Sequence, residues 1–276
     1  MIHKEKKIKK RENKIKKKKE KIKKREKEYC EKKENLNENE NENTISIFNS
    51  LKENWRSWTV VLLSSCILSY PNIYNGIITI VFCYMWSYWL HRFQHEYDLN
   101  ITNIIHQYHH DNHSFFSEFT EIIFEINFIN NCLPILLFDS FMNQWVIILF
   151  TFMYITIHKI NYSTLRVNSV HRLHHGDIHY NHGPDICDIM FGTKHPSETT
   201  VENTDHFIPN ILIGFVILYG IQYLWNNNFN YKCYMKNIGY TILISSYLIF
   251  FVSSIYLWYF TDFTKKWKKN TENTMI

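Results

Sequence analysis

Three histidine-rich stretches decide the fold of this chain: HRFQH (91–95), HQYHHDNH (106–113) and HRLHHGDIHYNH (171–182). All but one of the fifteen histidines lie between residues 91 and 206. Imidazole is the commonest metal ligand in proteins, and it suits iron, zinc, copper and nickel. Histidines crowded in this way beside apolar segments predict a buried metal centre.

The spacing within each stretch indicates helices. Offsets of three and four residues bring side chains onto one face of a helix, so each cluster can offer two or three nitrogens to a common point. A single pair with this spacing arises often by chance, and any one histidine could be a bystander. Three such clusters in one chain could surround two metal ions: His91 and His95; His106, His109 and His110; His171, His174 and His175.

Long apolar blocks separate the histidine clusters and predict membrane helices. Residues 57–90 contain no Asp, Glu, Lys, Arg or His. As one helix with a rise of about 1.5 Å per residue, this block would exceed a bilayer core of about 30 Å. Pro71 and Gly76 interrupt it, so we expect a hairpin of two helices over roughly 57–70 and 77–94.

Two further apolar pairs follow. The second block, 115–157, has its expected turn at residues 139–144, and the third comprises 207–231 and 237–261 with Lys232 and Lys236 in between. Hairpins cross the membrane an even number of times, so they keep all the histidine clusters on one side. Positive residues near both ends favour the cytosolic side. The predicted fold is all-α: an integral membrane bundle of about four to six helices with a cytosolic, histidine-rich helical cap.

Charge and hydropathy divide the chain into four predicted regions. Residues 1–44 contain eighteen Lys and Arg against ten Glu, which predicts a disordered basic tail. Such a tail is either solvated or attracted to anionic lipids. Nucleic-acid binding is not expected, because this tail lacks aromatic residues between its basic ones. The other regions are a membrane domain over 45–206 that carries the histidine clusters, a helix pair over 207–261 and a basic tail over 262–276.

Three carboxylates follow the second histidine cluster at helical spacing. Glu118, Glu121 and Glu125 stand at positions i, i+3 and i+7, which form one stripe on a helix. Metal-bound imidazole usually donates its outer N–H to a carboxylate or a carbonyl, so these residues could orient the histidines. For Glu118, a place in water at the membrane interface fits equally well. No ExxH pair of the soluble di-iron type is present, so the ligands must be mostly nitrogen.

Several motifs carry a resemblance to a known family. In chain order they are YWLHRFQH (88–95), HQYHH (106–110), HKINY (158–162), HRLHH (171–175) and YNHGPDICDIMFGTKHP (180–196). The series resembles the fatty acid hydroxylase and sterol desaturase superfamily over about residues 85–205. Members of that superfamily are integral membrane enzymes with a di-iron centre, and most use oxygen and two electrons to hydroxylate or desaturate lipids.

The resemblance implies a set of metal ligands and some supporting residues. Asp188 is expected to hold its loop by accepting hydrogen bonds, and Gly192 to permit a turn. His182 and His113 are candidates for a supporting or substrate-gating role, whereas His195 and His206 are not. The implied ligands are His91, His95, His106, His109, His110, His158, His171, His174 and His175, with His179 as a possible tenth.

The resemblance also implies a function. The expected activity is oxygen-dependent hydroxylation or desaturation of a fatty acyl, sphingoid or sterol lipid. The expected cofactors are two iron ions, with zinc possible instead, and O2 is the co-substrate. No haem-binding HPGG segment is present, so a separate donor such as a cytochrome b5-type protein or a reductase would supply electrons.

The site would face the cytosol, on an endoplasmic reticulum-type membrane in a eukaryotic host. Two alternatives stay open from the sequence. One is a zinc-binding membrane protein without redox chemistry, and the other is oxidation of an aldehyde or alkyl ether by the same centre.

Overall fold

A computed structural model describes residues 45–96, 99–101, 103–112, 114–127, 141–227 and 229–264, without the side chains of 229–240, 242 and 243. All regular secondary structure in these residues is helical, which confirms the predicted fold class. The helices are α2 (Ile47–Glu53), α3 (Trp55–Leu68), α4 (Ile73–Glu96), α5 (Ile104–Asp111), α6 (Phe115–Glu125), α8 (Gln144–Thr156), the π-helix η2 (Ile157–Thr164), α9 (Val170–Gly176), α10 (Asp185–Phe191), the 3-10 helix η3 (Asp205–Phe207), α11 (Ile208–Asn227) and α12 (Phe229–Phe260).

Three of the described helical segments are long and apolar enough to cross a membrane. They are Ile73–Glu96, Gln144–Thr164 and Asp205–Asn227, and two shorter apolar helices are Trp55–Leu68 and Ile244–Phe260. These segments fit the predicted integral membrane bundle. The total number of crossings stays a prediction, because the chain between α6 and α8 lies outside the described residues.

The first apolar block forms the predicted hairpin. Helix α3 ends at Leu68, the chain turns through Pro71, and α4 begins at Ile73. Gly76 lets the two arms approach closely, since a Cβ there would lie 2.5 Å from the backbone oxygen of Ser65. Pro71 therefore lies in the turn of the hairpin, and Gly76 lies where its two helices pack closely.

The third apolar block differs from its prediction. Lys232 and Lys236 were expected between two helices, but α12 begins at Phe229 and contains both. No Pro or Gly occurs between Gly220 and Gly239, so nothing in the sequence prevents the helix from forming this early. Of the expected turn of the second block, residues 141–143 are described and lead into α8, which begins at Gln144, whereas residues 139 and 140 and the tail 1–44 lie outside the described residues.

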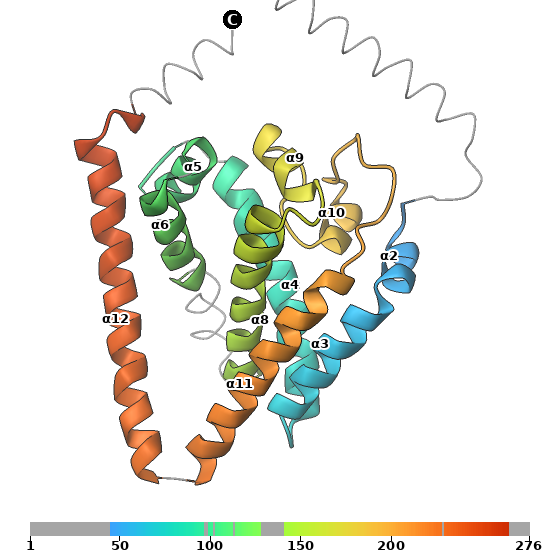
Figure 1. Ribbon diagram of the computed structural model, residues 1–276, viewed down its shortest axis with the longest axis vertical. Coiled ribbons are helices and arrows are strands. Elements are labelled where there is room, and N and C mark those ends of the chain that lie inside the picture. Colours follow the sequence, from blue (N-terminus) through green and yellow to red (C-terminus); the bar gives the residue numbers. More distant parts are fainter. Residues whose placement is uncertain are drawn as a thin grey trace, which may run out of the picture. The chain divides into compact units, whose positions relative to one another are not determined.

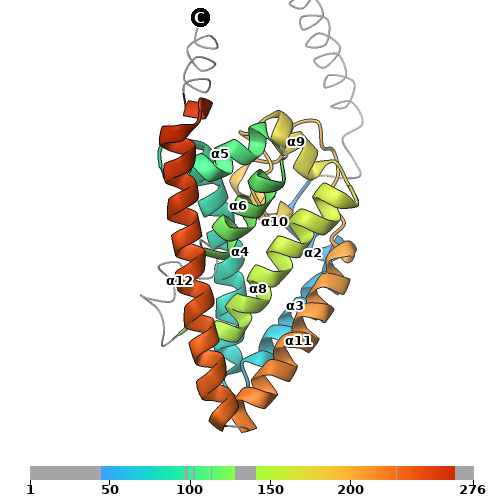
Figure 2. The ribbon, with the colours of Figure 1, turned by 60° about the vertical axis from the view of Figure 1, so that its left-hand side comes forward.

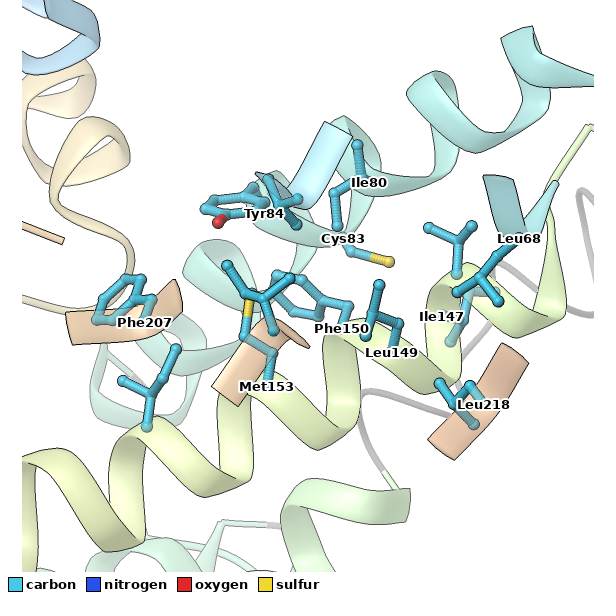
Figure 3. Packing of buried hydrophobic residues seen from close by; sticks show 14 of the residues in the cluster. Leu68, Ile80, Cys83, Tyr84, Ile147, Leu149, Phe150, Met153, Phe207 and Leu218 are labelled. Atoms are coloured by element: carbon cyan, nitrogen blue, oxygen red, sulfur yellow. The ribbon is translucent and has the colours of Figure 1, made fainter. Parts of the chain in front are cut away.

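Four helices enclose the main apolar core. Helices α3, α4, α8 and α11 contribute buried side chains that interlock along α8, and Figure 3 shows Phe150, Leu149 and Met153 at the centre of this cluster. Figure 2 shows α11 beside α3 and α8. A second cluster, including Ile105, Phe124 and Leu257, fixes α12 against α5 and α6. Within a bilayer, close packing of such side chains rather than their removal from water holds the helices together.

The histidine-bearing elements meet at one end of the bundle. Figure 1 shows α5, α9, the carboxyl end of α4 and the end of the α8 segment at this end. Helix α8 continues directly into η2, where the N–H of Leu165 donates to the oxygen of Ile160 at 2.8 Å. π-helical segments within α-helices often mark functional sites. This one carries His158 and Tyr162 to the histidine cap, and the sequence did not predict its π geometry.

Candidate metal centre

Nine of the ten predicted ligands form two compact groups. Within each group, one potential ligand atom per residue can be chosen so that all lie within 4.8 Å of one another. The first group is His91, His95, His106, His110 and His174, and the second is His109, His158, His171 and His175.

Each HxxHH motif contributes to both groups. On α5, His106 and His110 belong to the first group and His109 to the second. On α9 the division is reversed, because His174 belongs to the first group while the flanking histidines belong to the second. The short helices α5 and α9 therefore join the two groups into one centre.

His179 lies outside both groups, and we remove it from the ligand set. Helix α9 ends at Gly176, so the helical spacing that places His171, His174 and His175 does not extend to residue 179. His179 is exposed, and its backbone N–H donates to Oδ1 of Asp177. His195 and His206 are also outside the groups, as expected, and His113 is outside the described residues.

The outer ring nitrogens have acceptors that fix the imidazole rings. Nδ1 of His106 donates to Glu121 at 2.7 Å, and Nδ1 of His158 donates to Glu125. Nδ1 of His174 donates to the backbone oxygen of Tyr180 at 2.7 Å. The predicted orienting role of the α6 carboxylates is therefore confirmed for Glu121 and Glu125.

Glu118 has a mixed position. Its carboxylate forms a 2.8 Å ion pair with Lys159, and its other oxygen lies 3.5 Å from Nδ1 of His109. About a third of its side chain is exposed. Glu118 therefore lies at the edge of the centre, between the two roles that the sequence left open.

The inner ring nitrogens face one another at distances typical of metal ligands. Nε2 of His95 lies 3.0 Å from Nε2 of His106 and 3.1 Å from that of His174, and the Nε2 atoms of His158 and His171 lie 3.2 Å apart. Two nitrogens about 2.1 Å from one ion, at a right angle, would be about 3.0 Å apart. The spacing leaves room for an ion between the rings.

Proton accounting also favours a cation in the first group. The Tyr180 carbonyl can only accept, so Nδ1 of His174 carries its hydrogen and Nε2 has a lone pair. Nε2 of His106 is in the same state if its Nδ1 donates to the Glu121 carboxylate. Both lone pairs face Nε2 of His95, which has at most one hydrogen to offer. Nε2 of His91 and Nδ1 of His110 are also buried without a hydrogen-bond partner among the described residues.

Burial keeps the histidines of the cap in the neutral form that binds metal. It lowers the pKa of His109 to about 4. It also lowers the pKa values of His110, His171 and His174, and the neighbouring histidines add to the effect. Because only neutral imidazole has a free lone pair, the residues present fit two nitrogen-bound metal ions.

The loop after α9 is held by Asp188, as predicted. Its Oδ1 accepts from the backbone N–H of His182 at 3.0 Å and from the Thr193 hydroxyl at 2.7 Å, and its Oδ2 accepts from Gly183. Burial raises the pKa of Asp188 to about 7. Gly192 ends α10 with a φ of 69°, a conformation that favours glycine.

An apolar cavity reaches both histidine groups. Its walls include Phe150, Met153, Ile157 and Phe207, with His91 from one group and His158 and His171 from the other. His182 also lines it, and the ring centroid of His182 lies 6.0 Å from that of His91. A separate polar pocket reaches the second group from another direction, past His109, Lys159 and Arg172. The centre thus adjoins one apolar and one polar space.

The sequence missed one buried polar pair at this site. The Tyr162 hydroxyl donates to Oε1 of Glu202 at 2.6 Å, and the Asn168 side chain donates to the same oxygen at 2.5 Å. Tyr162 stood within the HKINY motif without an assigned role. Glu202 lies in a polar segment with no periodic pattern, so no signal in the sequence marked it.

Comparison with known proteins agrees with the geometry. Residues 76–193 match the family model described as fatty acid hydroxylase, and this range includes both histidine groups. No curated protein and no solved structure gives a significant match. The match confirms the resemblance drawn from the motifs: residues 76–193, the segment that carries both histidine groups, match the fatty acid hydroxylase family.

Proposed function

We propose that this chain is a membrane-bound, oxygen-dependent lipid hydroxylase or desaturase with two iron ions in the histidine centre. Its substrate would be a fatty acyl, sphingoid or sterol lipid. The family match supports lipid oxidation in general. The observation that carries the proposal is the pair of histidine groups that open onto one apolar cavity.

The residues of the chain have separate tasks in this proposal. The nine histidines would hold the two ions, and bound iron would supply oxygen activation with two electrons. Glu121, Glu125 and the Tyr180 carbonyl fix three of the rings, so the ligands need little rearrangement on binding. The walls formed by Phe150, Met153 and Phe207 would align a hydrocarbon chain and exclude water.

Partners and location belong to the same proposal. Electrons would come from a separate donor, such as a cytochrome b5-type protein or a reductase, because the chain has no haem-binding HPGG motif. The lipid would enter from the bilayer along the apolar helices. We propose an endoplasmic reticulum-type membrane in a eukaryotic host, with the centre on the cytosolic side.

Lipid profiling of a host that expresses the chain tests this function. The wild type should produce hydroxylated or desaturated lipids, and the purified protein should contain iron and consume oxygen when it is reduced. His174→Ala should abolish the new lipids, since it removes a ligand and its contact with Tyr180. His179→Ala is the matched control, because His179 is exposed and outside both groups.

The alternatives predict other results. Zinc as the only metal, without oxygen uptake after reduction, would contradict the proposal and favour a zinc-binding membrane protein. If no hydroxylated or desaturated lipid forms but an aldehyde or alkyl ether is consumed, the alternative of aldehyde or alkyl-ether oxidation is favoured.

A further inference from the structure

Tyr162 and Glu202 form a buried pair that begins at the apolar cavity. Tyr162 lines the cavity, and its ring stacks on that of His171 with a centroid distance of 5.9 Å. Its hydroxyl donates to Glu202, whose side chain is only 3% exposed. One end of the pair therefore lies beside a ligand of the second histidine group.

The other end of the pair lies at a hollow in the protein surface. Glu202 lines this hollow together with Asn168, Arg172, Glu198 and His206. Nε2 of His206 lies 3.9 Å from Oε1 of Glu202. The carboxyl and the phenol together connect a polar space outside the centre with the apolar cavity inside it.

The surroundings of Glu202 allow both of its protonation states. Burial raises the pKa of Glu202 to about 7, while hydrogen bonds from Tyr162 and Asn168 act in the opposite direction. The other charged groups that act on it are Asp185 and Lys194, with His206 and Arg172 at the hollow. A group that titrates near the working pH transfers protons most effectively.

The proposed chemistry requires protons in the cavity. Hydroxylation converts R–H, O2, two electrons and two protons into R–OH and water. The electrons come from the donor protein. The cavity surface is mostly apolar, and three of the four histidines that line it are proposed metal ligands, so the groups left to pass on a proton are His182 and three tyrosines, Tyr162 among them. Tyr162 lines this cavity, and its hydroxyl is hydrogen-bonded to the carboxyl of Glu202, which lines the hollow.

We propose that Tyr162 and Glu202 form a proton route from the hollow to the apolar cavity beside the metal centre, separate from the polar pocket past His109 and Lys159, an inference that rests on the proposed function. In the structure the Tyr162 hydroxyl donates to Glu202. Once Glu202 is protonated the direction reverses: the hydroxyl turns, the carboxyl gives its proton to the Tyr162 oxygen, and the Tyr162 hydroxyl hydrogen passes into the cavity. Tyr162 stays neutral overall, and the resulting Glu202 carboxylate takes a new proton from water in the hollow. Each cycle delivers one proton and leaves the pair unchanged.

Infrared spectroscopy of the metal-free protein tests the proton carrier without turnover. Between about pH 5 and about pH 9, the wild type should show carboxyl bands that titrate near neutral pH. Glu202→Gln should remove one component and Asp188→Asn a second, since burial also raises the pKa of Asp188. Tyr162→Phe should shift the Glu202 band. An unchanged titration in Glu202→Gln would overturn the proposal.

The coupling of oxygen use to product tests the route itself. Glu202→Gln keeps an oxygen that can accept from Tyr162 and Asn168, so the fold should persist, as thermal unfolding can verify. In Glu202→Gln and Tyr162→Phe, product per oxygen consumed should fall by at least about tenfold and hydrogen peroxide should rise. The solvent isotope effect of the wild type should change in both variants.

Glu198→Gln is the matched control, since Glu198 lines the hollow but Glu202 is the carboxyl that contacts Tyr162. Full coupling in Glu202→Gln would overturn the route alone. A wild type that consumes no oxygen would overturn the proposed function and the route together.

Discussion

Individual carboxylates decide how firmly each histidine is held. Glu125 is buried and accepts a hydrogen bond from Nδ1 of His158. The His158 ring therefore cannot rotate without losing this hydrogen bond. Outer partners of this kind typically contribute about 10- to 100-fold to metal affinity. The same reasoning applies to Glu121 and His106 in the other group.

Replacement of Glu125 should therefore lower the metal affinity of one histidine group more than that of the other. Glu125→Gln should lower the affinity of the second group by about 10- to 100-fold and leave the first group occupied. Metal analysis after dialysis against a chelator would measure this change. Glu96→Gln is the control, since Glu96 pairs with Arg92 on the surface. Equal loss of both metals would contradict separate groups.

The sequence predicted the ligands better than their arrangement. Helical spacing pointed to eight of the nine clustered histidines, because i, i+3 and i+4 offsets are a local property of a helix, and the family resemblance added His158. The division of each HxxHH motif between two groups depends on the packing of α5 against α4 and α9, which spacing does not encode. His179 lies outside both groups, because α9 ends before it.

At the scale of elements, close helix packing can be tested at glycine positions. A Cβ at Gly76 would lie 2.5 Å from the Ser65 backbone oxygen, so α3 and α4 would have to separate. Overpacking of this kind costs about 1–3 kcal/mol. Gly76→Ala should lower the melting temperature in detergent by several degrees, about 2–4 °C per kcal/mol.

Gly220→Ala provides the comparison for this prediction. A Cβ at Gly220 has nothing within 4 Å, and alanine favours a helix by about 1 kcal/mol over glycine. This variant should melt at the same temperature as the wild type or slightly higher. Equal destabilisation by both substitutions would show that the α3–α4 contact is not a tight one.

Elements were predictable where the sequence contains a strong break. The α3–α4 hairpin followed from Pro71 and Gly76, and the structure has it. The start of α12 was not predictable in this way: Lys232 and Lys236 suggest a polar connection, but lysine does not break a helix and α12 contains both residues. The π-helix at 157–164 has no sequence pattern that separates it from an α-helix.

For the whole molecule, a buried set of neutral histidines predicts sensitivity to acid. The pKa values of His109 and His182 are lowered to about 4 by burial, while unfolded histidine has a pKa of about 6.5. Between these values the unfolded chain binds more protons than the folded one, so stability falls as pH falls. Asp188 and Glu202, whose pKa values are raised to about 7, act in the opposite direction.

The buried histidines outnumber these two carboxyls, so the pH dependence of the folding stability should be that of the histidines. The metal-free protein should melt at a lower temperature as pH decreases from about 6.5 to about 4. His182→Phe should reduce this dependence, because phenylalanine cannot be protonated. A melting temperature that rises steadily over this range would contradict neutral burial of the histidine cap.

The number of metal ions bound per chain in two double variants tests most directly whether the nine histidines form two separate metal-binding groups. The wild type should bind two ions per chain. His106→Ala/His110→Ala removes two ligands from one group and should leave one ion, whereas His109→Ala/His110→Ala damages both groups and should leave neither firmly bound. Equal stoichiometry in the two double variants would contradict the division of the histidines.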